Sequence, residues 1–393
     1  MNEPIKQIKL ERILVFRTGH LGDTVVALPA FWTLRRRFPD AQITYLSNAD
    51  LDNPHYVTGR NVLPANGLFD SWLTYPNSAT GFSKLVELWR LRRRIKAGRF
   101  DAVFYLMTRG RTRRQIDRDV RFFKTAGIRR IIGAEYAKDN LLPPVVPVPA
   151  PTVRSEADFL LDCLSSEGIE VECGRPGADL LLTERERARA ANWLQSAVPT
   201  QDGFRPPVAF APGSKWESKI WDESRFAEVG ARLIEHRGIF PIVFGGEEDR
   251  EKGDRLLTAW ESGANAAGIL SVREAAAALE FCSLYVGNDT GTMHLAAAVG
   301  TPCVAIFAAI DWPGRWYPFG TNNRVFRVPV DCEGCQLPVS KNSGKCLEMI
   351  GVEEVYAACS EILESSRAQR KITYNSFNDP PVSVYARRPK LLD

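Results

Sequence analysis

The sequence predicts an α/β protein built from two doubly wound domains, each with a parallel sheet covered by helices. Three observations indicate this class. Short apolar strand candidates alternate with longer helix candidates, the alternation stops at a proline-rich stretch and then restarts, and 393 residues are too many for one ordinary core. Because strands that alternate with helices form parallel sheets, we expect two such units facing a central cleft.

The predicted domains are residues 1–175 and 176–365, followed by a C-terminal tail over 366–393. Five prolines in residues 139–152 exclude a regular helix there, so this stretch is a loop or an extended connector. We expect the tail either to lack regular structure or to pack back on the first domain.

Apolar spacing predicts the elements of each domain in order. Strands are short runs rich in β-branched and aromatic residues, and helices are longer segments with apolar residues at helical spacing. In the first domain, strands are predicted at 12–17, 42–46, 102–106 and 130–132, and helices at 25–38, 84–96, 115–126 and 155–168. In the second, strands are predicted at 207–211, 240–244, 282–286 and 303–307, and helices at 184–198, 224–236, 273–281, 293–299 and 352–363. Ligands of such folds bind outside the carboxyl ends of the strands, so the site is expected in the cleft.

The composition, 45% hydrophobic and 25% charged, is that of a soluble globular protein. No apolar run approaches the roughly 20 residues that span a bilayer, and the first residues lack the apolar core of a signal peptide. We therefore expect a cytoplasmic protein, with peripheral attachment to the inner membrane as an additional option.

Positive charge is concentrated in one part of the chain. Residues 84–130 contain 16 Lys or Arg and 4 Asp or Glu, a local charge of +12 within a net charge of +4. Two interpretations stand: solvated helix faces, or attraction of an anionic partner such as a glycolipid, a polysaccharide or a membrane surface. No nucleic-acid-binding module accompanies the cluster, so nucleic acid is not expected as a partner.

Four of the eight cysteines lie close together near the C-terminus, at Cys332, Cys335, Cys346 and Cys359. In a reducing compartment, such spacing favours a structural thiolate site for zinc or iron over disulfides. Cys359 lies in the predicted helix 352–363, where a core position is the alternative.

The first of four strand-to-helix junctions is the turn at residues 17–24. Gly19 and Gly22 permit a tight turn but lack the spacing of a dinucleotide fingerprint. Asp23 at this turn is a candidate general base, and the alternative is a helix cap.

Three junctions in the second domain have polar residues suited to a nucleotide. In residues 211–221, Lys215 and Lys219 can neutralise phosphate and Ser214 can donate to it. Residues 244–249 combine glycines with acids that can accept from ribose hydroxyls. Residues 286–298 form a strand, a capped turn with Gly291, and a helix whose first N–H groups favour a diphosphate.

Together, residues 15–23 with 28–30, residues 212–214 with 219–221, and residues 287–295 resemble the signatures of glycosyltransferase family 9, the heptosyltransferase-like enzymes. The resemblance covers most of residues 10–365. It implies a GT-B fold of two Rossmann-like domains, with the acceptor bound by the first and a nucleotide sugar by the second. It also implies inverting transfer, usually from ADP-heptose, without a catalytic metal or other cofactor.

The resemblance places catalytic roles on Asp23 and Lys219. The expected donor-binding residues are Ser214, Lys215, Gly246, Glu247, Asp249, Asp289, Thr290, Gly291, Thr292 and His294, with Glu248 as a further ribose contact. The expected acceptor-binding residues are Thr18, Gly19, His20 and Gly22.

The implied function is sugar transfer during assembly of bacterial lipopolysaccharide or surface polysaccharide. Three features depart from a minimal enzyme of this kind: the cysteine cluster, the tail, and residues 311–320, which follow a strand and can line the donor sugar. They leave a protein acceptor, as in autotransporter modification, as an alternative. A nucleotide-sugar epimerase and a non-catalytic nucleotide-binding scaffold are further alternatives.

Overall fold

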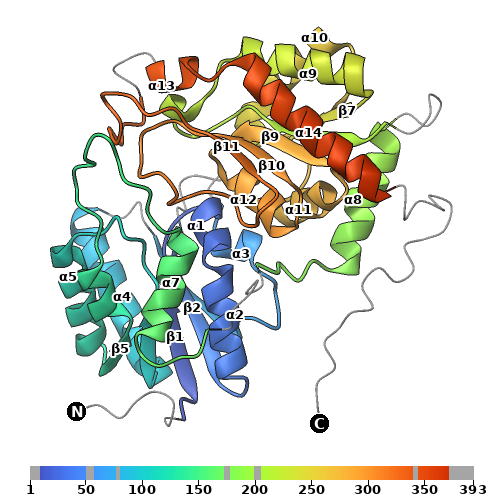
Figure 1. The fold of residues 1–393 in the computed structure, drawn as a ribbon. Coiled ribbons are helices and arrows are strands. Elements are labelled where there is room, and N and C mark those ends of the chain that lie inside the picture. The colour runs from blue at the N-terminus through green and yellow to red at the C-terminus, as the bar shows by residue number, and fades with distance from the viewer. Residues whose placement is uncertain are drawn as a thin grey trace.

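The structure, a computed structural model, describes residues 9–49, 57–76, 80–171, 178–198, 205–339 and 344–370. Within these ranges the chain forms two parallel β-sheets, each accompanied by helices, in two units that lie one above the other in Figure 1. The predicted α/β class with two parallel-sheet domains is therefore confirmed.

The first unit contains five strands: β1 (Arg12–Phe16), β2 (Gln42–Ala49), β3 (Ser71–Pro76), β4 (Ala102–Tyr105) and β5 (Arg130–Ile132). Its helices are α1 (Leu21–Val26), α2 (Leu28–Arg37), α3 (Gly59–Val62), α4 (Gly81–Gly98), α5 (Arg113–Thr125), α6 (Ala134–Asp139) and α7 (Glu156–Ser165). The strand order is β3-β2-β1-β4-β5, and Phe16 of the central β1 pairs with Leu46 and Tyr105 of its neighbours. Because all the strands are parallel, their carboxyl ends lie at one edge of the sheet.

The second unit contains six strands: β6 (Pro207–Ala211), β7 (Phe240–Val243), β8 (Ala264–Asn265), β9 (Leu284–Asn288), β10 (Cys303–Ile306) and β11 (Arg324–Phe326). Its helices are α8 (Glu184–Ala197), α9 (Glu223–Arg237), α10 (Arg250–Trp260), α11 (Val272–Glu280), α12 (Gly291–Ala298), α13 (Lys345–Glu348) and α14 (Val352–Arg370). The order is β11-β10-β9-β6-β7-β8, again parallel throughout. This places β6 and β9, and the loops that follow them, side by side.

The apolar core consists of two clusters, and the larger includes residues of both units. Strand β9 separates the clusters, because Leu284 and Val286 belong to the smaller one and Tyr285 to the larger one. This is the alternation that a strand buried on both faces requires. On the smaller cluster, α14 packs beside α9 (Figure 1).

The predicted elements are present, with differences at their ends and several additions. The predicted helix 25–38 is two helices that meet at Ala27, and the first already begins at Leu21, where the His20 and Asp23 groups form a capping box. Strands β3, β8 and β11 and helices α3, α6, α10 and α13 were not predicted. Most of these are only two to six residues long, too short to show an apolar period, whereas α10 is 11 residues long and buries Gly253, Leu256 and Trp260 at helical spacing.

The predicted boundary at 175/176 lies outside the described residues. The helix α14 continues past the predicted end of the second domain, and the tail beyond residue 370 also lies outside them. No helix in the described part of the chain is both long enough and apolar enough to cross a membrane.

Candidate active site

A cavity of about 870 Å³ lies between the two units, at the carboxyl ends of their strands. It is lined by the turn after β1 and by the loops after β6, β7, β9 and β10. The four junctions singled out from the sequence therefore meet at one site.

Asp23 lies in the first turn of α1, at the cavity wall. Its Oδ2 accepts a hydrogen bond of 2.9 Å from the backbone N–H of His20, so the carboxylate caps the helix as well as facing the cavity. The turn needs glycine at position 19, because φ there is +144° and a Cβ would lie 2.4 Å from the Asp23 Cβ.

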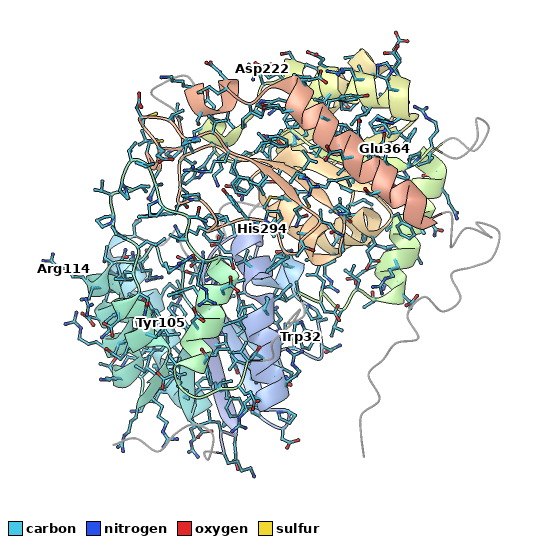
Figure 2. All side chains as sticks on the ribbon, viewed as in Figure 1. Trp32, Tyr105, Arg114, Asp222, His294 and Glu364 are labelled. Atoms are coloured by element: carbon cyan, nitrogen blue, oxygen red, sulfur yellow. The ribbon has the colours of Figure 1, made fainter. Side chains whose placement is uncertain are left out.

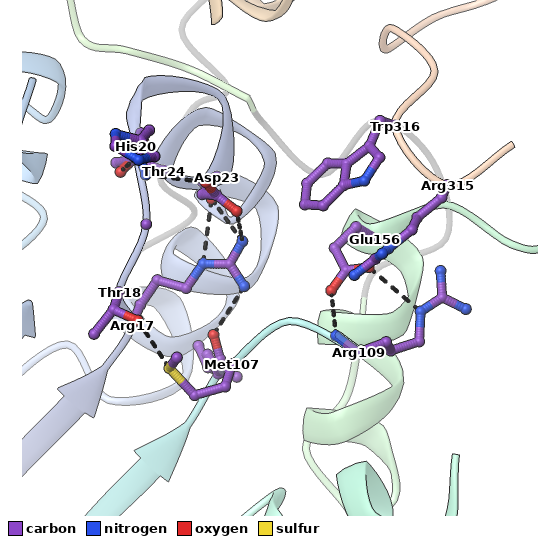
Figure 3. Close-up of polar contacts among 12 residues, drawn as sticks. Arg17, Thr18, His20, Asp23, Thr24, Met107, Arg109, Glu156, Arg315 and Trp316 are labelled. Atoms are coloured by element: carbon purple, nitrogen blue, oxygen red, sulfur yellow. Dashed lines mark hydrogen bonds and ion pairs between the residues drawn. The ribbon is translucent and has the colours of Figure 1, made fainter. Parts of the chain in front are cut away.

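Arg17 supports Asp23 from below, at the end of β1 (Figure 3). The guanidinium is fully buried and donates to the Asp23 carbonyl oxygen at 2.8 and 3.2 Å and to the Leu106 carbonyl oxygen at 3.0 Å. Its Nη2 also lies 3.8 Å from Asp23 Oδ1. Arg17 thus holds the backbone of the candidate base in place, a role that its place inside a strand motif did not reveal.

Asn288 holds the loop after β6 in place from the end of β9. Its fully buried amide donates to the carbonyl oxygen of Pro212 at 2.9 Å and accepts from the backbone N–H of Trp221 at 3.1 Å. These bonds tie the two ends of the loop that contains Lys219. The N-cap of α12 is Thr290, so the Asn288 side chain is free of that role and holds the loop instead.

Lys219 and Asp289 form an ion pair at the mouth of α12. Lys219 Nζ lies 2.5 Å from Asp289 Oδ2, and both side chains are largely buried. The ammonium group therefore stands beside the first N–H groups of a helix, where the helix dipole also favours a negative ligand.

The glycine turns of the two units contact each other directly. A Cβ on Gly291 would lie 2.6 Å from Leu21 Cδ2, and a Cβ on Gly22 would lie 2.9 Å from His294 Cδ2. Larger side chains at these two positions would separate α1 from α12. The close packing brings Asp23 of one unit near Lys219 and Asp289 of the other.

His294 is buried at this contact, near the middle of the molecule in Figure 2. Burial lowers the pKa of its imidazole, Asp289 and Asp23 oppose this shift and Lys219 adds to it, and the resulting pKa is about 4. The imidazole is therefore neutral at pH 7. Its Nδ1 has no hydrogen-bond partner in the described structure, and its ring lies edge-on to Trp316.

The acidic side chains after β7 form some of their contacts within their own loop. The Asp249 carboxylate lies between Gly213 and Gly245, and its Oδ2 accepts from the Gly246 N–H at 3.1 Å. Burial raises the pKa of this carboxyl group. Glu247 pairs with Arg250 at 2.9 Å on the rim of the cavity.

A buried charge cluster, made of Arg109, Glu156, Arg315 and Asp311, joins the two units beside the cavity. Figure 3 shows Arg109, Glu156 and Arg315 of this cluster. Glu156 is fully buried; its Oε1 accepts from the Arg109 N–H at 2.7 Å and its Oε2 from Arg315 Nε at 2.9 Å. Arg315 also bonds Asp311 at 3.2 Å, and Asp311 accepts from the Trp316 indole at 2.9 Å.

Residues 311–320 line the cavity through Asp311, Arg315 and Trp316, and their expected contact with the donor sugar stays a prediction. The interdomain part of the cluster was not predicted, since Arg109 and Glu156 belong to no recognisable motif.

Most of the predicted site residues line the cavity. They are Asp23, Lys219, Ser214, Lys215, Gly246, Glu247, Asp249, Asp289, Thr290, Gly291, Thr292, His294, His20 and Gly22. Thr18 and Gly19 are not among its lining residues: the Thr18 hydroxyl contacts the Met107 sulfur, and the Gly19 N–H donates to Asn48.

The predicted structural metal site is not supported. Cys359 lies on the buried face of α14, inside the smaller core cluster. Burial raises the thiol pKa of Cys346, and the nearby Cys332 and Cys335 add to this shift, while the hydrogen bond from the Ala309 N–H to its sulfur opposes it. Within the described ranges, no group of three or more His, Cys, Asp or Glu side chains is arranged to hold a metal ion.

Comparison with known proteins identifies relatives. Residues 157–345 match the family model of glycosyltransferase family 9 (heptosyltransferase). Lipopolysaccharide heptosyltransferase 2 of Salmonella typhimurium is 32% identical over 130 residues, which are 32% of this chain and 37% of that enzyme. Lipopolysaccharide heptosyltransferase 1 of Pseudomonas aeruginosa is 24% identical over 345 residues, which are 82% of this chain and 86% of that enzyme. The match to the first of these relatives thus spans little more than a third of its length.

A solved structure shares the fold over nearly the whole chain. The ADP-heptose lipopolysaccharide heptosyltransferase II of Escherichia coli superposes with a TM-score of 0.64 at 20% identity, covering 91% of this chain and 99% of that one. The predicted GT-B fold is confirmed by this likeness together with the two parallel sheets.

Proposed function

Since the chain contains a domain of glycosyltransferase family 9, the heptosyltransferases, we propose that it transfers heptose from ADP-heptose to a hydroxyl group of an anionic glycolipid during lipopolysaccharide assembly. The observation that carries the proposal is that one and the same cavity is lined by Asp23 from one unit and by Lys219, Asp289 and the start of α12 from the other. A transferase needs both a base for its acceptor and a stabiliser for its leaving group.

The donor is proposed to lie against the second unit. Its diphosphate fits the N-terminus of α12, with Lys219 as the neutralising cation and Ser214, Lys215 and Thr292 at the cavity wall. The acids of the loop after β7 provide acceptors for ribose hydroxyls. Heptose as the sugar and ADP as the nucleotide are supported by the names of the relatives, one of which is an ADP-heptose enzyme.

The reaction is a single displacement with inversion. Residues of this chain accept the proton of the acceptor and stabilise the negative charge on the leaving group. Asp23 accepts the proton of the acceptor hydroxyl while that oxygen forms a bond to the anomeric carbon. The bond from this carbon to the diphosphate oxygen breaks, and the leaving oxygen takes the electron pair. Lys219 and the first N–H groups of α12 stabilise the charge that develops there, and no step requires a metal ion.

The acceptor is proposed to approach from the first unit, along the turn that contains His20 and Gly22. Residues 84–130, with their local charge of +12, favour an anionic glycolipid there. This charge also favours peripheral attachment at the membrane where such glycolipids are assembled.

The test is an Asp23→Asn variant assayed for transfer from ADP-heptose to a purified lipopolysaccharide inner-core acceptor. Asparagine keeps a hydrogen-bond acceptor for the His20 N–H but is not a base, so we expect transfer to fall about 10²- to 10⁴-fold. Binding of ADP, measured by calorimetry, should stay within a few-fold of the wild-type value.

Asp40→Asn, at an exposed position after α2, is the matched control and should retain full activity. Near-normal turnover of Asp23→Asn would refute the assigned base. Conversion of ADP-heptose by the wild-type protein without any acceptor would instead indicate an epimerase.

A further inference from the structure

The helix α4 exposes a stripe of large apolar side chains. Phe82, Leu85 and Trp89 are 80%, 64% and 52% exposed, at positions i, i+3 and i+7 of one helix face. No other helix in the described ranges carries three large apolar side chains with this exposure. Single exposed apolar residues are ordinary, but a stripe on one helix face indicates a surface that something covers.

This stripe is not the face with which α4 packs on its own unit. That face has Leu91 and Ile95, which are buried in the core. At about 100° per residue, these positions lie on the opposite side of the helix from Phe82 and Trp89. The helix is therefore apolar on both sides, and only one side is used by the fold.

Positive charge extends the outer stripe toward the C-terminal end of α4. Arg93 and Lys96 continue it along the same face, and the Arg93 guanidinium lies over the Trp89 ring at 4.7 Å. The neighbouring helix α5 contacts α4 and adds exposed cations, among them Arg114, which projects outward in Figure 2. An apolar stripe edged with Lys and Arg is the pattern of a helix that lies in an anionic membrane interface.

The stripe lies at the end of α4 that is nearer to the cavity. The helix follows β3, so its first turns lie at the carboxyl edge of the first sheet, the edge that faces the second unit. The loop between β4 and α5, which contains Arg109 and Arg111, begins at the same edge. A bilayer that touched Phe82 would thus lie at the same edge of the first sheet as the cavity.

We propose that this α4 surface, made of Phe82, Leu85, Trp89, Arg93 and Lys96, docks the protein on an anionic lipid bilayer. The three apolar side chains enter the boundary between headgroups and acyl chains, and the two cations contact lipid phosphates. This inference adds a lipid surface to the proposed function, and its test measures lipid binding without sugar transfer. The two can therefore fail separately.

The experiment is co-sedimentation of the full chain with vesicles of phosphatidylethanolamine that contain about 30% phosphatidylglycerol, at about 0.1 M salt. Replacing Phe82, Leu85 and Trp89 by Gln keeps helix propensity and removes the apolar stripe. We expect this triple variant to bind about tenfold more weakly or worse. The matched control replaces the exposed residues Val145, Ile269 and Met349 by Gln, and should bind as the wild type does.

The charge part of the surface is tested with Arg93→Glu combined with Lys96→Glu. This variant should lose binding to the anionic vesicles by about tenfold or more, and high salt should weaken the wild type in the same direction. Far-UV circular dichroism checks that the variants are folded.

Failure of the wild type to bind these vesicles, or equal binding by the α4 triple and the control triple, would overturn the proposal. So would a wild-type dimer, seen in sedimentation velocity, that the α4 triple converts to monomer, because the surface would then bind a second copy.

Discussion

Glu156 links the two units through the buried charge cluster, and its replacement by Gln should strongly lower the free energy of unfolding. The carboxylate is fully buried and accepts from the guanidinium groups of Arg109 and Arg315 and from the Arg109 backbone N–H. Arg315 belongs to the second unit, whereas Arg109 and Glu156 belong to the first. The glutamine side chain is almost the same size as that of glutamate, but it has no charge. Its NH₂ group also directs two N–H donors toward groups that are themselves donors.

The expected cost follows from these contacts. Breaking a buried ion pair by removing one charge costs about 3 to 5 kcal/mol, because the partner charge stays buried without compensation. Asp311 still pairs with Arg315 at 3.2 Å, so we expect the lower end of this range, about 3 kcal/mol. Glu156→Ala would also leave the Arg109 N–H without an acceptor and should cost about 1 to 3 kcal/mol more.

Urea unfolding followed by tryptophan fluorescence measures the loss. With an m value on the order of 3 kcal/mol per molar, the midpoint should fall by about 1 M in Glu156→Gln. Glu184→Gln is the control, since this carboxylate is 95% exposed and its ion pair with Arg187 is 4.0 Å long. A midpoint for Glu156→Gln that equals that of the control would refute the idea that the cluster stabilises the contact between the units.

Three further predictions concern the cavity. Lys219→Ala should lower the rate of transfer by about 10²- to 10³-fold and weaken ADP binding in calorimetry. Lys9→Ala, at an exposed position, is the control and should change neither. Unchanged kinetics in Lys219→Ala would contradict the contact between Lys219 and the leaving group. Asn288→Ala removes the hydrogen bonds to the loop after β6 and should lower the free energy of unfolding, measured in urea, by about 3 kcal/mol. The exposed Asn140→Ala is the control and should lower it by about 0.5 kcal/mol. Equal losses in the two variants would contradict the role of Asn288. His294 has a folded pKa of about 4, below its unfolded value, so the unfolded state binds the proton first as the pH falls. Wild-type stability should therefore drop by about 3 kcal/mol more than that of His294→Gln between about pH 6.5 and 4, and parallel pH profiles would contradict the buried neutral imidazole.

The local sequence was enough to predict the elements that hold the cavity. The strands that end at Phe16, Ala211 and Asn288 are apolar runs followed at once by glycine and polar residues, so their type and direction could be read without tertiary information. Parallel strands bring such loops to one edge, which explains why the predicted donor residues line the same cavity.

The roles of single side chains were less predictable, because each depends on a partner far away in the chain. Asn288 reaches a loop about 70 residues earlier, and Arg17 reaches Leu106. A buried Arg or Asn is costly unless it is paired, but the sequence does not show which of many such residues becomes buried. The four cysteines illustrate the opposite error, since their spacing suggested a common site and the folding of α14 placed Cys359 in the core.

The charge cluster shows why the contact between the two units lay beyond sequence reasoning. Glu156 is the first residue of α7, where an acid is ordinary because it complements the helix dipole. Its actual partner, Arg315, lies 159 residues later in a loop whose shape depends on Gly314, at a φ of +88°. A Cβ on Gly314 would lie 2.2 Å from the Val153 carbonyl oxygen, so the loop reaches Glu156 only because that position is glycine. The ion pair between Glu156 and Arg315 thus forms only when the two units are packed together. No local sequence motif could therefore have predicted it.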